Sequence, residues 1–308
     1  MSESVHAVVP TRNNLAELQT CVASLQEQRQ PVQQILVCVD GSVDGTVAWV
    51  RDFAEEDSRV RCLTHEGNQH RGRAATRNLA LTAIRDGFVW FVDSDMQLRE
   101  DALALHLRLA VAKDATSVGA VEYSNREAST WAGYLNTRGR HRFSDGEAIP
   151  YTQFTTANSL VPAEHFLALK GFDLRFGGYG GEDIEFALRL LASSRRPLVN
   201  NLRAVAETIE DKTVPQAMQQ FESFGETNLH LIERLHPEAE RMFHLQRYGS
   251  SRPADRLYRL SMNPATDALA ELALRIGPSG PRYQALNYKV VRAVWTGYHR
   301  GADARTPT

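Results

Sequence analysis

Residues 88–95 read FVWFVDSD, and this stretch decides the fold class that the sequence predicts. Its first five residues form an unbroken apolar run, which is typical of a parallel strand buried on both faces. Asp93 and Asp95 follow directly, so we expect both carboxylates at the carboxyl end of that strand, where open α/β sheets bind ligands. Carboxylate oxygens suit Mg²⁺ or Mn²⁺ shared with a diphosphate. A solvated turn is the alternative for so short a pattern.

The segments before this strand alternate strand and helix patterns. Apolar runs at residues 5–9, 35–39 and 60–63 are each followed by a pattern with a 3.6-residue period. Asn14 and Asp44 are expected to cap the first two of these helices. Strands separated by helices imply right-handed crossovers and a mostly parallel sheet. The sequence therefore predicts a Rossmann-like α/β domain.

Composition narrows the class of protein. The chain has 308 residues, of which 43% are hydrophobic and 23% charged, enough for one large domain or a domain with an appendage. A net charge of -2 argues against a nucleic-acid binder. Because no 18-residue apolar stretch and no signal-peptide pattern occur, we expect no membrane span and a cytoplasmic location. Three separated cysteines, Cys21, Cys38 and Cys62, are expected to be small core residues.

The second half of the chain is less regular. A helix is expected around residues 103–110 and a strand around 118–123. Residues 124–152 are polar and predict a long surface loop, either a lid or a solvated connection. From residue 212 onward, helical patterns punctuated by prolines predict a helical extension. This extension is expected to cover an acceptor site, to form a homodimer, or to dock on a membrane.

A second acidic pair follows a glycine-rich segment. Residues 176–183 read FGGYGGED, and a helical pattern then places Glu182 and Asp183 at a helix N-terminus. Acidic residues there are often ordinary caps. Four glycines around Tyr179 permit a close backbone approach to a ligand and can act as a hinge. A carboxylate held beside such a loop is suited to act as a general base.

Two further clusters have both a functional and a structural interpretation. Asp40 ends the strand at residues 35–39, where its carboxylate can accept from a nucleobase N–H or simply cap a turn. Arg73 and Arg77 lie four residues apart on one helix face. Their guanidinium groups suit a pyrophosphate, and a solvated basic face is the alternative.

The order and spacing of these motifs over roughly residues 5–207 resemble family-2 glycosyltransferases of the GT-A fold. The motifs are PTRN at 10–13, VDGSVDGT at 39–46, ATRN at 75–78, DSD at 93–95, GFD at 171–173 and ED at 182–183. The stretch GYGGED at 178–183 is also similar to the GWGGED loop of β-1,4-galactosyltransferases. The resemblance implies a GT-A catalytic domain over 1–211, with a nucleotide-sugar-binding half at about 1–98 and an acceptor-binding half at about 99–211. A helical extension would occupy 212–308.

The resemblance also implies roles for individual residues. Those that would contact the donor nucleotide are Pro10, Thr11, Asn13, Asp40, Arg73, Arg77, Asp93, Ser94 and Asp95. Asp95 would be the chief ligand of a divalent Mn²⁺ or Mg²⁺ ion, with Asp93 and Glu207 as further candidates. Glu207 stands near the place where many members carry a metal-binding histidine, which this chain lacks. Asp183 would be the catalytic base and Glu182 would orient a sugar. Tyr179, Gly180 and Gly181 would line the acceptor and sugar pocket.

The function implied is transfer of a hexosyl or N-acetylhexosaminyl group from a nucleotide sugar, with a UDP-sugar favoured. The acceptor would be a glycan, a small molecule or a peptide, and direct displacement would invert the anomeric centre. One alternative is a catalytically silent nucleotide-binding scaffold on the same fold. Another is a sugar-nucleotide pyrophosphorylase, which needs a glycine-rich loop with Arg and Lys where this chain has PTRNN at 10–14.

Overall fold

The computed structural model of the protein describes residues 3–137, 139–237 and 252–303. The chain forms two compact units. The first, the sheet unit, comprises Met1–Asn125, Leu135–Gly177 and Glu182–Ile209. The second, the helical unit, comprises Arg126–Tyr134, Gly178–Gly181 and Glu210–Thr308. Residues 238–251 and 304–308 of the predicted extension lie outside the described residues, and the domain boundaries at 98 and 211 stay predictions.

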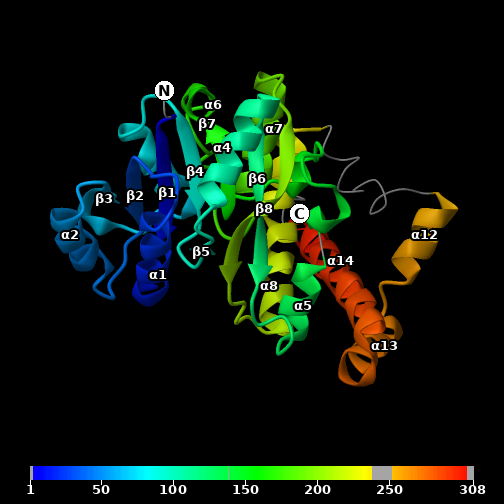
Figure 1. Cartoon of the computed structure of the whole chain (residues 1–308). Coiled ribbons are helices and arrows are strands. Elements are labelled where there is room, and N and C mark those ends of the chain that lie inside the picture. The colour runs from blue at the N-terminus through cyan, green and yellow to red at the C-terminus, as the bar shows by residue number, and fades with distance from the viewer. Residues whose placement is uncertain (1–2, 138, 238–251, 304–308) are drawn as a thin grey trace. The chain divides into compact units, whose positions relative to one another are not determined.

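Within the described residues, an eight-stranded mixed sheet forms the centre of the sheet unit (Figure 1). Its strands are β1 (Val5–Thr11), β2 (Gln34–Val39), β3 (Val60–Thr64), β4 (Phe88–Val92), β5 (Gln97–Leu98), β6 (Thr116–Tyr123), β7 (Asn158–Pro162) and β8 (Leu198–Thr208). Their order in space is β3-β2-β1-β4-β7-β6-β8-β5. The first four strands are parallel to one another, as predicted, whereas β7 runs antiparallel to both β4 and β6. β6 and β8 are parallel, and β5 is antiparallel to β8.

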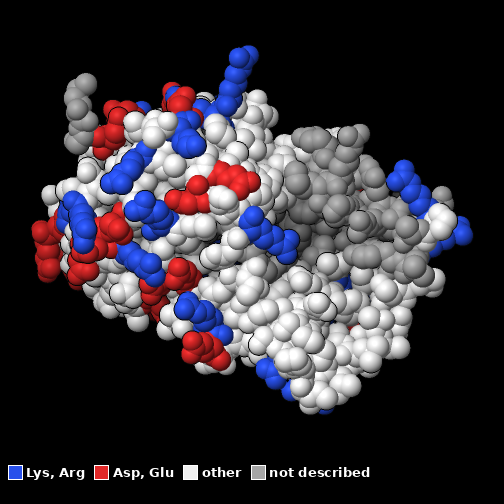
Figure 2. All heavy atoms as spheres, turned by 45° about the vertical axis from the view of Figure 1, so that its right-hand side comes forward, with Lys and Arg blue, Asp and Glu red and all other residues white. Residues whose placement is uncertain are grey.

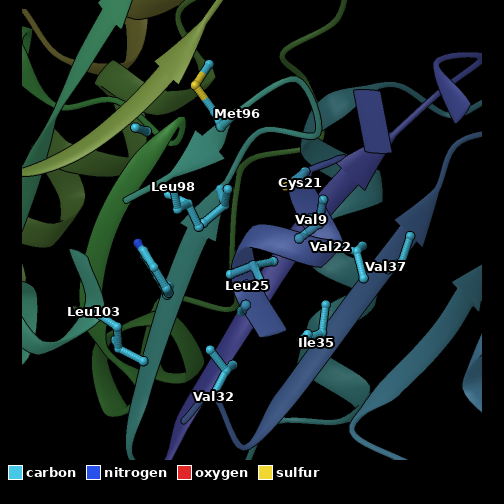
Figure 3. Packing of buried hydrophobic residues seen from close by; sticks show 14 of the residues in the cluster. Val9, Cys21, Val22, Leu25, Val32, Ile35, Val37, Met96, Leu98 and Leu103 are labelled. Carbon is cyan, nitrogen blue, oxygen red and sulfur yellow. The ribbon is translucent and has the colours of Figure 1, made fainter. Parts of the chain in front are cut away.

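The helices of the sheet unit are α1 (Leu15–Gln26), α2 (Thr46–Glu56), α3 (Arg73–Asn78), α4 (Ala102–Lys113), α6 (Ala163–Ala168) and α7 (Glu182–Ser193). α1 shows how the core forms, because its Val22 and Leu25 are fully buried among strand residues such as Val9 and Ile35 (Figure 3). Burial of each such side chain stabilises the fold by about 1.5–3 kcal/mol. This packing fixes the strand ends that carry the polar residues of the predicted site.

Strands β7 and β8 of the sheet were not predicted from the sequence. β7 contains Asn158 and ends at Pro162, and β8 contains Asn200 and Asn201, so their local patterns resemble loops. Asn158 is fully buried because its amide donates to the carbonyls of Ala120 and Ala204 at 3.0 and 2.9 Å. A buried polar group with all its hydrogen bonds made is compatible with a strand interior.

The prediction of a long surface loop over residues 124–152 is wrong for part of that range. Helix α5 (Thr130–Asn136) lies within it, and Trp131 and Tyr134 on this helix are buried. In the helical unit, the ring of Trp131 lies 6.2 Å from that of Phe221, and the Tyr134 hydroxyl donates to Asn287 at 2.7 Å. Two aromatic residues three positions apart give the segment an apolar face, which its polar neighbours obscure in the sequence.

The helical unit confirms that the C-terminal part of the chain is helical. Its helices are α8 (Val214–Glu226), α9 (Asn228–Leu235), α12 (Pro253–Leu260), α13 (Pro264–Ile276) and α14 (Ser279–Asp303). α8 and α14 pack closely at Gly225 and Gly297. A Cβ on either glycine would collide with the backbone of the facing helix, so the close packing requires glycine at both positions. None of the described helices is both long and apolar enough to cross a bilayer. On the face shown in Figure 2, basic and acidic side chains are intermingled, in keeping with the small net charge.

Candidate active site

The predicted donor residues lie where the parallel strands of the sheet unit end. Thr11 is the last residue of β1, Asp40 follows β2 and Asp93 follows β4. Because β2, β1 and β4 are adjacent and parallel, their carboxyl ends meet at one edge of the sheet. This edge is where ligands bind in open α/β sheets.

Arg77 is a buried cation that connects the two acidic motifs. Its side chain is 4% exposed, and its Nη2 donates to Asp93 Oδ1 at 2.9 Å. Its Nη1 donates to Oε1 of Glu182 at 3.1 Å. The carboxylates raise the pKa of Arg77, although burial alone would lower it. The guanidinium therefore stays charged and holds the end of β4 next to the start of α7.

Local packing explains why Arg77 points inward. The guanidinium carbon lies 5.7 Å from the centre of the Phe172 ring, a distance at which a cation is attracted to an aromatic face. Asn78 fixes Phe172 by a pair of 2.8 Å hydrogen bonds, one to its N–H and one to its carbonyl. Gly171 is required there because a Cβ would collide with the Asn78 amide, and its φ is +74°. The ATRN and GFD motifs thus form one support for the Arg77 side chain.

Asp183 is the half-buried carboxyl next to this ion pair. Burial, together with the negative charge of Glu182, raises its pKa to about 7, and the charge of Arg77 opposes that shift. Its Oδ1 accepts from the Ile184 N–H at 2.9 Å. A carboxyl with a pKa near neutrality can hold or release a proton at ordinary pH, which is the property of a general base.

The carboxylate of Asp40 is surrounded by donors. Its Oδ1 accepts from the Arg71 N–H at 2.7 Å, and both oxygens lie within 3.2 Å of the Gly72 N–H. Nδ1 of His70 lies 2.8 Å from Oδ2, and Nε2 of His65 lies 3.8 Å from Oδ1. Desolvation opposes ionisation, but these donors outweigh it and keep the pKa of Asp40 below its usual value. Asp40 therefore holds the start of α3 against the end of β2.

The remaining donor-side residues link the loops to one another. The Asn14 amide donates to Ser94 Oγ at 2.7 Å and accepts from the Thr11 hydroxyl, so this N-cap residue of α1 makes no side-chain cap bond. Asn13 Oδ1 accepts from the Val43 N–H at 2.8 Å. Two further bonds reach Asp44, from the N–H groups of Leu15 and Thr46 at 3.1 and 3.2 Å. These bonds hold the three strand ends together.

The remaining residues that were predicted to bind the donor nucleotide differ in solvent exposure. Arg73 and Asp95 are exposed, Pro10 is partly buried, and Ser94 is 7% exposed. Arg73 and Arg77 therefore do not form the shared surface face that their spacing suggests. Arg77 faces the protein interior, whereas the side chain of Arg73 is exposed.

The glycine-rich loop at 178–181 belongs to the helical unit. A Cβ on Gly181 would lie 3.1 Å from the Phe224 ring and 3.3 Å from Ile232, and the φ of Gly181 is +94°. The Asn228 amide donates to the carbonyls of Gly180 and Tyr179, at 2.6 and 3.4 Å. The close approach that these glycines permit is therefore to α8 and α9. A Cβ on Gly177 or Gly178 would meet no atom within 4 Å among the described residues.

The candidate metal ligands do not form a complete metal site by themselves. Across the described residues, no three His, Cys, Asp or Glu side chains gather in an arrangement that could hold an ion. Asp95 is exposed, Asp93 shares its carboxylate with Arg77, and Glu207 is paired with Arg99 at 3.0 Å. Mg²⁺ in nucleotide enzymes is commonly held by one or two carboxylates plus substrate phosphates. Asp95 and Asp93 fit that pattern, because both supply hard oxygen donors at the sheet edge.

Sequence reasoning missed two classes of residue: histidines at the sheet edge, and asparagines that position loops. His65 and His70 follow β3 at the same sheet edge, and two histidines in one loop after a strand are a signal that could have found them. Asn228 and Asn78 position loops through their amides, and no local pattern distinguishes them from ordinary helix residues.

Comparisons with known proteins give the family. Residues 6–167, just over half of the chain, match the profile described as glycosyl transferase family 2. The chain belongs to this family. Residues 140–247 also match the profile described as the N-terminal domain of galactosyltransferase.

Relatives of this family-2 chain share only part of their length with it. Putative glycosyltransferase EpsH of Bacillus subtilis is 32% identical over 107 residues, which are 35% of this chain and 30% of EpsH. Validoxylamine A glucosyltransferase of Streptomyces hygroscopicus is 27% identical over 215 residues, 60% of this chain and 50% of the relative. The chain thus spans half or less of the length of these curated relatives.

Solved structures confirm the predicted GT-A fold for this family-2 chain. The mannosyltransferase PcManGT from Pyrobaculum calidifontis, in complex with GDP-Man and Mn²⁺, has a TM-score of 0.60 at 18% identity, covering 97% of this chain and 88% of the other. TarS 1-349 of S. aureus in complex with UDP-GlcNAc has a TM-score of 0.56 at 14% identity, covering 98% and 92%.

Proposed function

We propose that this chain is a glycosyltransferase that moves a hexosyl or N-acetylhexosaminyl group from a nucleotide sugar to an acceptor hydroxyl. The observation that carries the proposal is the buried guanidinium of Arg77, joined to Asp93 and Glu182 next to Asp183. Burying one cation among carboxylates costs several kcal/mol per ion in desolvation. A catalytically silent scaffold has no need for such an arrangement, so this cost favours an enzyme.

The donor nucleotide would bind along the carboxyl edge of β2, β1 and β4. Thr11, at the end of β1, and Asp40, after β2, would contact the nucleobase, and Asp93, after β4, would contact the sugar. The exposed guanidinium of Arg73 is placed in the first turn of α3, where it would meet the diphosphate. Relatives solved with UDP-GlcNAc and GDP-Man support a nucleotide sugar as the class of donor.

Asp183 would act as the base in a direct displacement. Its carboxylate accepts the proton of an acceptor hydroxyl while that oxygen forms a bond to the anomeric carbon of the donor. The bond between this carbon and the diphosphate oxygen breaks, and the nucleoside diphosphate leaves with the electron pair. Attack opposite the leaving group inverts the anomeric centre. A pKa of about 7 keeps a large fraction of Asp183 ionised at neutral pH and still basic enough to take a proton.

A divalent Mn²⁺ or Mg²⁺ ion would be held by Asp95 and Asp93 together with diphosphate oxygens. When bound, such an ion neutralises charge that develops on the leaving diphosphate. Glu207, paired with Arg99 at 3.0 Å, would be a further candidate ligand. Arg77, fixed behind Asp93, adds a permanent positive charge at the same strand end.

The segment at 178–183 would form the acceptor and sugar pocket, in the manner of the galactosyltransferase loop that it resembles. The match of residues 140–247 to a galactosyltransferase domain covers this loop and supports that interpretation. Tyr179 would line the pocket, Gly180 and Gly181 would shape it, and Glu182 would orient the bound sugar.

A donor-consumption assay tests this proposal. The purified chain is incubated with UDP-sugars and GDP-sugars in the presence of Mn²⁺, and nucleotide release is measured with sugar acceptors and with water. We expect turnover of at least one donor, and a loss of about 10²–10⁴-fold in Asp183→Asn, the usual contribution of a general base. Asp52→Asn, at an exposed acid of α2, is the matched control. Equal turnover in Asp183→Asn and wild type would exclude Asp183 as the base.

A further inference from the structure

The family resemblance implies that the Asp40 carboxylate contacts the nucleobase, but its oxygens already accept hydrogen bonds from the protein. Asp40 is 5% exposed, and its oxygens already accept from Arg71 N–H, Gly72 N–H and the His70 ring. A nucleobase N–H that bonded to Asp40 directly would have to displace one of these donors. The group that extends outward from Asp40 is the imidazole of His70, whose side chain is 51% exposed.

The neighbours of His70 determine which ring nitrogen carries the proton. Nδ1 lies 2.8 Å from Asp40 Oδ2, and an ionised carboxylate only accepts hydrogen bonds, so Nδ1 carries a hydrogen. Nε2 lies 3.4 Å from Nη1 of Arg12, and a guanidinium only donates. Both contacts therefore select the tautomer with its hydrogen on Nδ1, in which Nε2 is an acceptor. The buried carboxylate of Asp40 thus orients His70 so that its Nε2 presents a hydrogen-bond acceptor at the surface of the sheet edge.

The loop that carries His70 is fixed in place. The Asn68 amide donates to the carbonyl of Ser42 at 2.9 Å, which ties the loop to the end of β2. Gly41, with φ +69°, lets the loop lie close, because a Cβ there would be 2.7 Å from the His70 N–H nitrogen. A ring held from two sides loses little entropy when it binds a ligand, which is the condition for selective recognition.

We propose that Nε2 of His70, with Arg12 beside it, recognises the imide edge of a uracil or thymine base. An imide presents one N–H between two carbonyl oxygens. The N–H would donate to Nε2, replacing the long contact to Arg12, and a guanidinium N–H of Arg12 would then donate to an adjacent carbonyl. Cytosine has no hydrogen on N3, and guanine places an amino group beside its N1–H, which would face the Arg12 donors. His70 and Arg12 would thus make the chain selective for UDP- or dTDP-sugars.

This inference rests on the proposed function, and the test separates the two. Calorimetric titration compares UDP with its N3-methyl derivative, which cannot donate, and with CDP, dTDP and GDP, all in the presence of Mn²⁺. We expect wild type to bind UDP about tenfold more tightly than N3-methyl-UDP, as one hydrogen bond to a fixed partner provides. His70→Phe should bind the two ligands with equal affinity, and His70→Gln, whose amide oxygen can replace Nε2, should keep part of the preference.

The results that would contradict this inference differ in whether they also contradict the proposed function. If no nucleotide binds wild type, the proposed function and this inference both fail. If UDP binds but wild type does not distinguish it from N3-methyl-UDP, or if His70→Phe keeps the full preference, only the role of His70 fails. Circular dichroism of each free variant checks the fold, which the half-exposed position of His70 should leave intact. dTDP binding as tightly as UDP would support imide recognition, and GDP binding more tightly than both would overturn it.

Discussion

Nη1 of Arg77 lies 3.1 Å from Oε1 of Glu182, although the two residues are 105 positions apart in the sequence. The same guanidinium donates to Asp93, so one buried cation joins the end of β4 to the start of α7. Asp183, the next residue of α7, is thereby placed in a cluster with one positive and several negative charges. Its raised pKa follows from burial and from Glu182 in that cluster.

Replacing Arg77 should strongly destabilise the sheet unit. Arg77→Met leaves Asp93 and Glu182 without their shared cation, and breaking a buried ion pair costs about 3–5 kcal/mol. Arg77→Lys keeps the charge but lacks the planar fork that reaches both carboxylates, so an intermediate loss is expected. Urea unfolding at pH 8 measures both, with Arg61→Met at an exposed site on β3 as control. An unfolding midpoint of Arg77→Met equal to that of the control would refute the structural role.

Turnover should depend on pH through Asp183. Because its pKa is about 7 and the base must be ionised, kcat/KM should rise about tenfold per pH unit below 7 and level off above it. Glu182→Gln removes the negative charge that helps to raise this pKa, so the inflection should move to lower pH. A pH–rate profile of wild type and Glu182→Gln checks both points. The assignment is wrong if the inflection stays in place in this variant.

The same pKa predicts the stability of Asp183→Asn. The unfolded state has the ordinary pKa of 3.8, so between about pH 4 and 7 the folded state binds more protons than the unfolded one. Wild-type stability therefore falls as pH rises through this window, and the full cost is present above pH 7. Asp183→Asn should unfold at a higher temperature than wild type at pH 8, by about 2–4 °C for each kcal/mol of this cost that the substitution removes. Near pH 4 the difference should vanish, and a variant less stable at pH 8 would contradict the prediction.

Asn228 should affect substrate affinity through the glycine-rich loop. Asn228→Ala removes the donor to the carbonyls of Gly180 and Tyr179, so the loop loses one fixed conformation. We expect the KM for the acceptor to rise about tenfold, with a smaller change in kcat, since one hydrogen bond is lost. Asn263→Ala, which removes the N-cap of α13 in the same unit, is the matched control. Similar acceptor KM values for the two variants would argue against this role.

The strand ends were predictable because their signal is local. The apolar run at 88–92 corresponds to β4, and the carboxylates after it lie at the sheet edge as expected. The predicted cap at Asp44 is off by one residue, because Gly45 is the N-cap residue of α2. Asn14 is the N-cap residue of α1 as predicted, but its side chain bonds to Ser94, 80 positions away, in place of its own helix. A residue type can therefore mark an element boundary correctly even when its side chain serves a distant partner.

The inward direction of Arg77 was not predictable, because it depends on distant residues. Its spacing from Arg73 suggests one shared helix face, and the partners that turn it inward are Phe172 and Glu182, about a hundred positions later. The same holds for β8, in which Asn201 is buried because its amide donates to Ser117 Oγ at 3.0 Å. Periodicity in the sequence identifies the apolar face of an element. It does not identify the polar residues that are buried with hydrogen-bond partners from distant parts of the chain.

Ligand-dependent thermal unfolding tests the central claim most directly. The chain is heated with UDP, GDP, CMP or dTDP, each with and without Mn²⁺, because a ligand that binds the folded state raises the midpoint. We predict a rise with UDP that requires Mn²⁺ in wild type and is absent in Asp95→Asn. If no nucleotide raises the midpoint under either condition, the donor site at the carboxyl edge of β2, β1 and β4 is contradicted.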